Sequence, residues 1–596
     1  MALTKLTAII TSIVYALLAQ AADANFCDPP SPAFFPPNIS HPAHTKLLSH
    51  TTAKLSSHLN RLISSYEYNT TSFSVEVTSQ TETLLSLHHT ARERSTLYHG
   101  GAKVINDTTC YRIASITKSF TVLALFQLQE VGKLNLDDSI LTYLPDLNGT
   151  GHLPWKDITI HSLASQNAGL PRDFAQDDYV NHPEVPDKLG LPRLDPYSKQ
   201  YRDLPSCDEM VNYTRSCDED DFLDWIKKIQ PTFAPNQRSS YSNINFDLLG
   251  LVIGNVTGMS YERYVTEHIL EPLGLTSGTG FEAPPDAQAA IAKGIEYYWS
   301  FYIGVQNPTG GLYANTKDMS IWLRYALSTF NAHAHGALNW FQPTSWSDGL
   351  STFYGMPWEI FRAKTSDIID SKSDRALTFI TKGGGLPGYT SWIVMIPEYS
   401  IGITVLVAGN SKAMSEIAHI VIGEMVALAE EIVLKELHSQ YVGRYVDHGN
   451  NDTTMVIKVS ETHGLYVDSW TSNGTDVKKG LKDFFSQDGS DIVLHLSPTL
   501  LYANQKGQQG ERWRILLRKA STERPEKPSV WDKFCVADVE LFMYGGVAMN
   551  ELVFWKGEDG ATDEIEPVAY RTSLKRSAAV GTYSPYESGD QAYIGS

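Results

Sequence analysis

The chain has 596 residues, of which 42% are hydrophobic and 19% charged, a composition typical of a globular protein and enough for two to four domains. Its formal net charge is −19, from 48 basic and 67 acidic residues. Because such an excess of acid repels phosphate groups, we expect neither a nucleic-acid partner nor attachment to an anionic membrane. The charge identifies no substrate, and its simplest role is to keep the protein soluble.

The first residues have the order of a secretory signal peptide. Lys5 precedes an apolar run at 6–19, and small-residue cleavage sites follow at 19–21 and 22–24. The run is short for a membrane-spanning helix, and no later stretch is long and apolar enough for one. We therefore expect residues 1–24 to be a signal peptide and the mature protein to be secreted (extracellular), with no membrane attachment after cleavage.

Sequons and cysteines agree with export. Eight Asn-X-Ser/Thr sequons predict N-glycosylation, at Asn38, Asn69, Asn106, Asn148, Asn212, Asn255, Asn451 and Asn473. Disulfides are expected in an exported protein, and Cys207 with Cys217 closes a short local loop, so we predict that bridge. Cys27 with Cys110 is a further expected pair. With Cys535 the count is odd, which leaves one free thiol or a bond between molecules.

In chain order, the first predicted elements are a proline-rich lead-in at 26–42 and an amphipathic helix at 45–66, where leucines recur at helical spacing. Strands follow at 70–90, where polar residues alternate with apolar and β-branched ones. An apolar helical run then begins beside Ser115 and ends at Gly132. Residues 175–230 are polar and proline-rich and predict an inserted loop region. Two further helices are predicted at 241–271 and 317–330.

The second half of the chain changes character near His438. Before it, residues 376–408 predict strands around a glycine turn, and residues 411–437 predict a closing helix. After it, short alternating segments separated by Gly, Asn and Asp turns predict an all-β, barrel-like accessory domain. We therefore expect a first domain over residues 25–437 and an all-β domain over residues 438–596.

Ser115-Ile116-Thr117-Lys118 is a Ser-x-x-Lys pair at the start of an apolar helix. On a helix, these two side chains point to the same face, one turn apart. A serine hydroxyl is a weak nucleophile until a base takes its proton, and a partly desolvated lysine can serve as that base. The alternative is a helix-capping serine followed by a solvated lysine. The catalytic interpretation is favoured because a lysine in an apolar helix needs a reason to be there.

Tyr241-Ser242-Asn243 and Lys382-Gly383-Gly384 are the second and third elements. A tyrosine beside a serine–lysine pair can act as a base when nearby cations lower its pKa, and Asn243 can orient substrate and lysine. Lys382 can bind a carboxylate or lower the pKa of the tyrosine, and the glycines allow a backbone N–H to approach the substrate. Each element alone is a weak signal. Their order over about 270 residues makes the set specific.

The order of these elements and the text around them resemble the serine β-lactamase and penicillin-binding-protein superfamily, in particular its class C-like esterase and D-aminopeptidase branch. The resemblance covers about residues 45–435, and the part after it resembles a small barrel-like domain attached to some exported fungal members. The matching stretches are Tyr-Arg-Ile-Ala-Ser-Ile-Thr-Lys-Ser-Phe-Thr (111–121), Ile-Thr-Ile-His-Ser-Leu-Ala-Ser-Gln-Asn-Ala-Gly-Leu-Pro (158–171), Tyr-Ser-Asn-Ile-Asn-Phe-Asp-Leu-Leu-Gly (241–250), Pro-Thr-Gly-Gly-Leu-Tyr-Ala-Asn-Thr-Lys-Asp-Met (308–319) and Lys-Gly-Gly-Gly-Leu-Pro-Gly-Tyr-Thr-Ser (382–391).

The resemblance implies an α/β (α+β) fold of the β-lactamase/transpeptidase type: an antiparallel sheet flanked by helices, an all-helical subdomain, and a site between them. It implies that Ser115 forms an acyl-enzyme and that Lys118 and Tyr241 move protons. The backbone N–H groups of Ser115 and Gly385 would form the oxyanion hole. Substrate-binding roles are implied for Asn243, Lys382, Gly384 and Gly385.

Two departures from the family pattern bear on the substrate. The region 175–230 is long, and we expect it to reshape the pocket. The third motif continues to Gly385, where many lactam-binding members carry Ser or Thr, so a hydroxyl suited to a lactam carboxylate is missing. Both departures favour an esterase or acyltransferase over a β-lactamase.

Three functions remain open from the sequence. The first is a secreted serine hydrolase acting on a small ester, amide or lactam through Ser115. The second is an acyltransferase of secondary metabolism, which uses the same acyl-enzyme with a different acceptor. The third is a non-catalytic binding protein on the same fold. The substrate and the oligomeric state are not fixed by the sequence.

Other chemistries lack their motifs. We expect no metal, because His41-x-x-His44 and His333-x-His335 have no acidic partners in a ligand pattern. We expect no cofactor, because no phosphate-binding glycine loop occurs. An α/β-hydrolase is disfavoured because the chain has no Gly-x-Ser-x-Gly.

Overall fold

The computed structural model describes residues 35–97, 100–174, 184–195, 197–198, 207, 215–330, 339–447, 449, 452–485, 491–520 and 543–578. The chain divides into two compact units. The larger unit comprises Ile39–Arg362 and Thr378–Met425, and the C-terminal unit comprises Met1–Asn38, Ala363–Leu377 and Val426–Ser596. The expected signal peptide at 1–24 lies outside the described residues. Among the described residues, no helix combines the length and hydropathy needed to cross a bilayer.

The larger unit is organised around a sheet of eight strands in the order β2-β1-β10-β9-β8-β7-β6-β5. Hairpin neighbours such as β8 and β9 pair antiparallel, and β1 pairs antiparallel with β10, which brings the first and last strands of the unit together. The strand bounds are β1 (Ser72–Thr78), β2 (Thr83–His89), β5 (Ser345–Trp346), β6 (Thr352–Tyr354), β7 (Glu359–Lys364), β8 (Ala376–Leu386), β9 (Tyr389–Ile396) and β10 (Ile401–Ala408).

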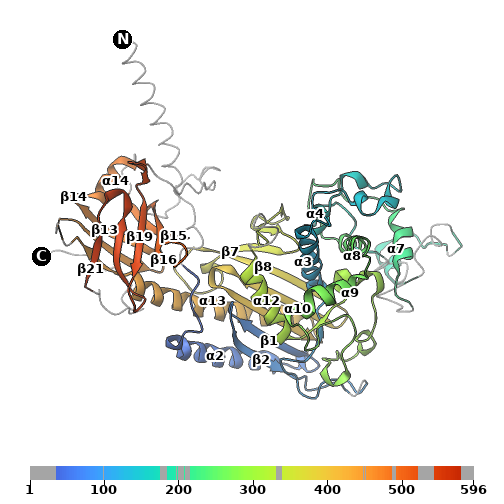
Figure 1. Ribbon diagram of the computed structural model, residues 1–596. Helices are drawn as coiled ribbons and strands as arrows, with labels where there is room; N and C mark the ends of the chain where they lie inside the picture. The colour runs from blue at the N-terminus through green and yellow to red at the C-terminus, as the bar shows by residue number, and fades with distance from the viewer. Residues whose placement is uncertain are drawn as a thin grey trace, which may run out of the picture. The chain divides into compact units, whose positions relative to one another are not determined.

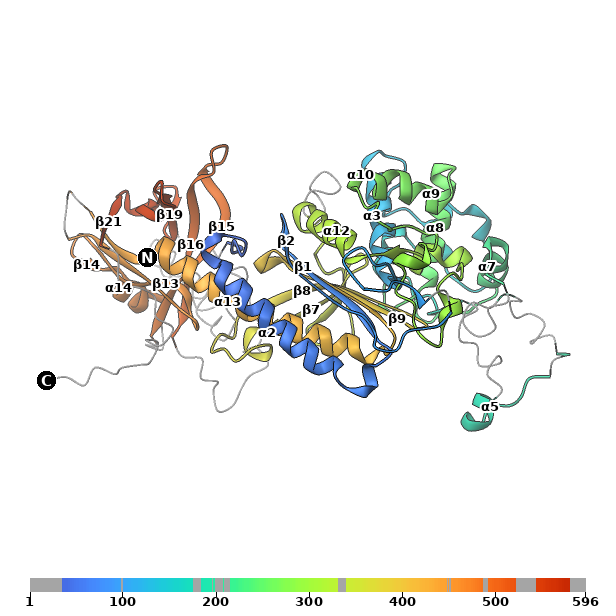
Figure 2. The same ribbon diagram turned by 90° about the horizontal axis from the view of Figure 1, so that it is seen from below.

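Helices cover both faces of this sheet. Helix α2 (Thr45–Ile63) lies beside α13 (Lys412–Tyr441), and the ion pair between Lys54 and Glu424 at 2.9 Å joins them. Helix α12 (Thr316–Thr329) packs against β1 and β10 from the other side (Figure 2). Every residue of β1 and of β10 is buried, as expected for central strands covered on two faces.

A helical region lies at one end of the sheet and contains α3, α8 and α9 (Figure 1). Helix α3 is apolar around most of its circumference, and most of its residues are buried. The backbones pack closely here, since a Cβ on Gly250 of α8 would lie 2.1 Å from the Pro308 side chain. The helix bounds are α3 (Thr117–Glu130), α4 (Ile160–Ala164), α5 (Glu184–Leu189), α7 (Glu219–Ile226), α8 (Ile244–Thr257), α9 (Tyr261–Val265), α10 (Glu271–Leu273) and α11 (Asn307–Gly310).

The C-terminal unit is rich in strands. Its nine-stranded sheet has the order β12-β11-β21-β20-β19-β16-β15-β13-β14, and β12 also pairs with β13, so the sheet closes into a ring. One helix, α14 (Val477–Phe485), belongs to it. The strand bounds are β11 (Gly443–Val446), β12 (Thr454–Ser460), β13 (Gly464–Ser472), β14 (Thr475–Asp476), β15 (Ile492–Asn504), β16 (Gln509–Lys519), β17 (Met543–Tyr544), β18 (Val547–Ala548), β19 (Glu551–Lys556), β20 (Thr562–Pro567) and β21 (Leu574–Ala578).

The fold class expected from the sequence is confirmed: an antiparallel sheet with helices on its faces, a helical region, and a strand-rich C-terminal part. The boundary expected at 437/438 stays a prediction. In the described part of the region 175–230, α5 and α7 form, and Cys207 and Cys217 are joined by the expected disulfide. The pair Cys27–Cys110 was wrong, because the thiol of Cys110 is free and buried.

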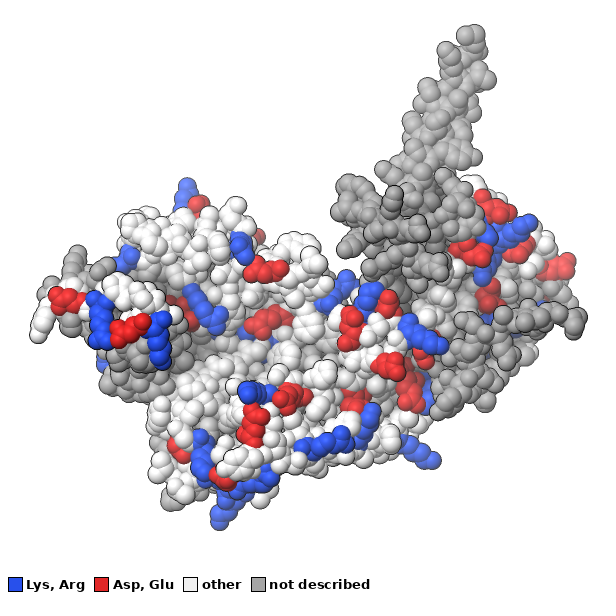
Figure 3. Space-filling view, turned by 180° about the vertical axis from the view of Figure 1, so that it is seen from behind, with Lys and Arg blue, Asp and Glu red and all other residues white. Residues whose placement is uncertain are grey.

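Most of the described sequon asparagines are exposed, as a glycosylation site requires. Five of the predicted acceptor asparagines are exposed: Asn38, Asn106, Asn148, Asn255 and Asn473. Asn69 is half-buried, and Asn212 and Asn451 lie outside the described residues. Glycosylation itself stays a prediction. On the face shown in Figure 3, Lys and Arg side chains lie beside Asp and Glu side chains, so the acid excess is not gathered there.

The two glycines after Lys382 differ in the space around them, which gives a first prediction. A Cβ on Gly384 would lie 2.5 Å from the carbonyl oxygen of Ile113, whereas no described heavy atom lies within 4 Å of a Cβ placed on Gly385. Gly384→Ala should therefore push β8 off the turn at Ile113 and lower the free energy of unfolding by about 1–3 kcal/mol. Gly385→Ala is the matched control and should change it by less than about 0.5 kcal/mol. Urea unfolding followed by circular dichroism measures both, and equal losses would contradict this packing.

Candidate active site

Ser115 stands on a tight turn between a short strand and a buried helix. Strand β3 (Tyr111–Arg112) pairs with β4 (Tyr313–Ala314), and the short 3-10 helix η4 (Ala114–Ile116) follows directly, before α3 begins. Ala114 has a φ of 48°, a left-handed conformation that costs a non-glycine residue of order 1 kcal/mol. Strain of this kind, held directly before a candidate nucleophile, is typical of functional sites.

The hydroxyl of Ser115 is held between two proton-bearing groups. The ammonium of Lys118 donates to Ser115 Oγ at 2.9 Å, and the hydroxyl of Tyr241 donates to the same oxygen at 2.9 Å. The structure thus brings together three residues from two distant parts of the sequence. Both partners are within the reach that a general base needs.

Lys118 is completely buried, and its ammonium has three acceptors. Besides Ser115 Oγ, it donates to Asn243 Oδ1 at 2.8 Å and to the carbonyl oxygen of Thr309 at 2.9 Å. Burial lowers the pKa of Lys118 below its usual value, and the charge of Lys382 adds to this, although Tyr241 opposes it. A lysine held in this way can become neutral more easily than one in water.

Tyr241 is surrounded by cations. The Nζ atoms of Lys118 and Lys382 lie 5.2 and 5.1 Å from the centre of its ring, and the Arg172 guanidinium carbon lies at 4.9 Å. Burial alone would raise the pKa of Tyr241, but the charges of Lys118 and Lys382 outweigh burial and lower it, against the opposing charge of Glu359. The phenol is therefore easier to deprotonate than a tyrosine in water.

These side chains face one open pocket of about 430 Å³. The sequence motifs supply seven of its lining residues: Ser115, Tyr241, Asn243, Lys382, Gly383, Gly384 and Gly385. Lys118 lies buried behind Ser115. The structure thus brings the predicted residues to one place, while their catalytic and binding roles stay predictions.

The sequence motifs did not single out several residues of the site. Arg172, Tyr354 and Glu359 line the pocket, and Glu359 forms an ion pair with Lys382 at 2.6 Å. Thr309 lies in the stretch 308–319, which resembles the family. No motif predicted that its carbonyl oxygen accepts a hydrogen bond from Lys118. Glu359 begins β7, and no strand was predicted there, so the sequence offered no signal for it.

Asp247, one turn along α8 from Asn243, bonds the same Thr309 whose carbonyl oxygen accepts a hydrogen bond from Lys118. Its Oδ1 accepts a hydrogen bond from the Thr309 hydroxyl at 2.7 Å, and Oδ2 has no partner among the described residues. Burial raises the pKa of Asp247 to about 8, although the Thr309 hydrogen bond and the charge of Lys118 act against the rise. At neutral pH the folded protein therefore holds this carboxyl mainly protonated.

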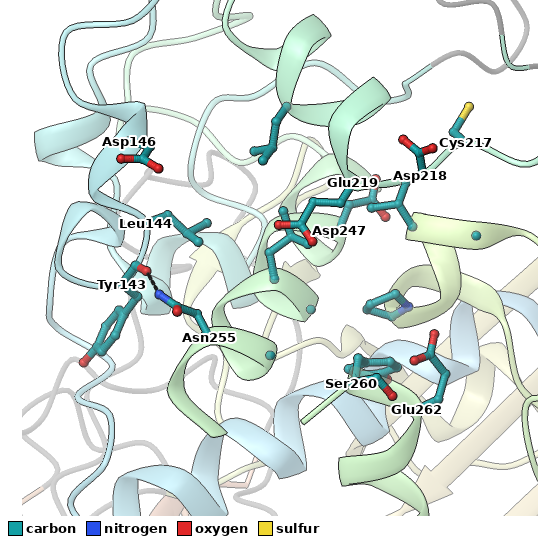
Figure 4. Close-up of a pocket in the computed structure, with 18 of the residues that line it drawn as sticks. Tyr143, Leu144, Asp146, Cys217, Asp218, Glu219, Asp247, Asn255, Ser260 and Glu262 are labelled. Atoms are coloured by element: carbon teal, nitrogen blue, oxygen red, sulfur yellow. Dashed lines mark hydrogen bonds between the residues drawn. The ribbon is translucent and has the colours of Figure 1, made fainter. Parts of the chain in front are cut away.

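A second hollow of about 970 Å³ is lined by residues of α7, α8 and α9, including Glu219, Asn255 and Glu262 (Figure 4). In it, Asn255 donates a hydrogen bond to the carbonyl oxygen of Tyr143. Ser115 is not among the described residues that line this hollow. It is larger than the Ser115 pocket, but the contacts of Lys118 and Tyr241 with Ser115 Oγ lie at the smaller one. No group of three or more metal-ligating side chains occurs within the described residues.

The raised pKa of Asp247 predicts a pH-dependent stability. Because the folded state holds a proton that the unfolded chain loses above about pH 4, the free energy of unfolding should fall as pH rises towards 8, by up to about 1.4 kcal/mol per pH unit. Asp247→Asn should remove this slope and become more stable relative to the unsubstituted protein at pH 8 than at pH 5. Urea unfolding at pH 5, 6.5 and 8 measures the difference. A difference that stays constant with pH would mean that Asp247 is ionised in the folded state.

The whole chain is similar to proteins of one family. A family model described as Beta-lactamase matches residues 85–422, and a model described as Beta-lactamase-like-like, C-terminal domain, matches residues 434–578. A probable hydrolase of Phoma sp. is 30% identical over 587 residues, 96% of this chain and 94% of that protein. A probable hydrolase of Cochliobolus lunatus is 30% identical over 88% of this chain and 87% of its own length. A β-lactamase-like protein of Arthroderma benhamiae is 27% identical over 83% of this chain and 86% of its own length. The chain belongs to the β-lactamase family.

Proposed function

We propose that this protein is a serine hydrolase that cleaves a small ester, amide or lactam through a covalent acyl-enzyme on Ser115. The observation that carries the proposal is the pair of 2.9 Å contacts that Lys118 and Tyr241 make with Ser115 Oγ. Family membership supports it, as do the two relatives named as probable hydrolases. A binding protein would have no need to keep a lysine buried beside a serine, since burying an ammonium is costly.

In the proposed first half-reaction, the Lys118–Tyr241 pair takes the proton of the Ser115 hydroxyl while Oγ attacks the substrate carbonyl carbon. Negative charge develops on the carbonyl oxygen, and the backbone N–H groups of Ser115 and Gly385 would stabilise it. The bond to the leaving group then breaks, and the leaving group takes the proton from the same pair. Ser115 is left as an ester of the acyl group.

In the second half-reaction, water takes the place of the leaving group. The Lys118–Tyr241 pair removes a proton from the water as its oxygen attacks the acyl carbon, and the proton returns to Ser115 Oγ as the ester bond breaks. The products are a carboxylic acid and the free enzyme. Because the pKa values of Lys118 and Tyr241 are both lowered, the pair gives up a proton more readily than the same groups in water and can act as a base.

We also propose that the protein acts outside the cell. The signal-peptide pattern at 1–24 and the exposed sequons support this location. The disulfide between Cys207 and Cys217 supports it too, because such bonds persist in oxidising compartments.

Replacing the nucleophile gives the direct test of the mechanism. Ser115→Ala should abolish turnover of p-nitrophenyl esters and the acyl adduct seen by intact mass, because among the described residues Ser115 carries the hydroxyl that bonds both Lys118 and Tyr241. Ser119→Ala is the matched control: Ser119 is buried one turn further on and bonds only the Ile116 carbonyl at 2.7 Å in the described structure. It should keep the adduct. Full activity of the Ser115→Ala variant would contradict the proposed mechanism.

The two residues proposed to move protons give a further prediction. Lys118→Met and Tyr241→Phe should each lower kcat/KM by about 10²-fold or more, as the loss of a general base does. Tyr354→Phe removes the hydroxyl of another tyrosine in the same pocket, and it should lower kcat/KM much less than Tyr241→Phe does. Steady-state kinetics on one ester at several pH values compares the three. Equal losses for Tyr241→Phe and Tyr354→Phe would argue against a proton-transfer role for Tyr241.

A further inference from the structure

Glu359 occupies the position beside the cation that could otherwise receive an anionic substrate. Lys382 Nζ donates to Glu359 Oε1 at 2.6 Å and to the Gly383 carbonyl oxygen at 2.8 Å. The other carboxylate oxygen of Glu359 accepts the Gly383 N–H at 3.0 Å. The Lys382 side chain is only 1% exposed, whereas that of Glu359 is 35% exposed. The carboxylate thus lies on the pocket side of a cation that is otherwise closed off.

This pairing changes what the pocket can attract. Glu359 and Lys382 both line the pocket that contains Ser115. The positive charge of Lys382 is compensated by a carboxylate in direct contact, and a substrate carboxylate placed there would meet the like charge of Glu359. Selectivity can arise from such a repulsive element as well as from a new attraction.

The other charged groups near this point, Arg172 and Lys118, have partners of their own. Arg172, at the rim, is paired with Asp173 at 3.2 Å. Lys118 is buried, and its ammonium bonds Ser115, Asn243 and Thr309. Two titratable tyrosines also lie near Glu359: Tyr241 in the loop before α8, and Tyr354 at the end of β6.

We propose that Glu359 is a specificity-determining residue that fills the anion position at Lys382, so that the enzyme selects uncharged esters and amides over substrates with a carboxylate close to the scissile carbonyl. This inference rests on the proposed serine-hydrolase function and narrows its substrate class. A single side chain on β7 then separates neutral acyl substrates from lactams and peptides that carry a carboxylate.

The test compares two esters that share a leaving group. p-Nitrophenyl butyrate is neutral, and mono-p-nitrophenyl succinate carries a carboxylate at the end of an acyl chain of the same carbon count. The unsubstituted protein should prefer the neutral ester in kcat/KM. Glu359→Gln keeps oxygen and size but loses the charge, and it should reduce that preference at least tenfold. Glu359→Asp keeps the charge and should retain most of the preference, which separates charge from a merely structural role.

A pH profile gives a second readout. The charge of Glu359 acts to raise the pKa of Tyr241, so Glu359→Gln should move the acidic limb of kcat/KM for the neutral ester to lower pH. Glu359→Asp should leave the limb near its original position. An unchanged preference together with an unchanged limb in Glu359→Gln would overturn the inference.

A binding measurement separates this inference from the proposed function. If neither ester gives turnover or an adduct on Ser115, the esterase part of the hydrolase proposal fails, and calorimetric titration of monomethyl succinate into Ser115→Ala and into Ser115→Ala/Glu359→Gln decides on Glu359. At least tenfold tighter binding of this anion to the double variant supports the specificity role without any catalysis. Equal affinity for the two proteins overturns it.

Discussion

The buried ammonium of Lys118 is the constraint on which the site depends. A charged group taken out of water is costly unless hydrogen bonds replace its hydration. Three acceptors do so, and they come from three separate segments: Ser115 from the turn before α3, Asn243 from the start of α8, and Thr309 from α11. The need to satisfy one lysine therefore fixes three pieces of chain around the proposed nucleophile. A contact that holds the fold together here is also the contact that would carry a proton.

The scaffold around this lysine is packed tightly enough to hold strain. Ala114 keeps a left-handed backbone directly before Ser115, and such a conformation persists only where surrounding contacts impose it. Strand β8 supplies one of them, because Gly384 approaches the Ile113 carbonyl at a distance that a side chain would block. Ser391 of β9 donates to the same carbonyl at 2.7 Å. Strands β8 and β9 thus contact the turn before Ser115, while residues of the helical region accept hydrogen bonds from Lys118.

Much of this arrangement could be predicted from the sequence, because periodicity and motif order are local signals. The apolar spacing in 45–66 predicted α2, and the β-branched run in 376–408 predicted β8, β9 and β10. Ser115, Lys118, Tyr241, Asn243 and Lys382 were found because each stands in a short motif. Glu359 and Asp247 were not, since their roles come from what lies opposite them in space. Strand β7 was missed because its six residues, of which Ile360 is the one fully buried, show little alternation. The pairing of cysteines failed at Cys110 for the same reason: burial of a thiol leaves no mark in the spacing.

The charges around Tyr241 link substrate choice to proton transfer. Lys118 and Lys382 lower the pKa of its phenol, and Glu359 opposes them. If Glu359 excludes substrate carboxylates, the same charge also sets how readily the phenol gives up its proton. A site that lost Glu359 to admit an anionic substrate would therefore shift its own base at the same time, and the incoming carboxylate would restore part of the lost negative charge beside Lys382. In this family member the protein itself supplies that charge, so the balance that tunes Tyr241 is present before any substrate binds and does not depend on what the substrate carries.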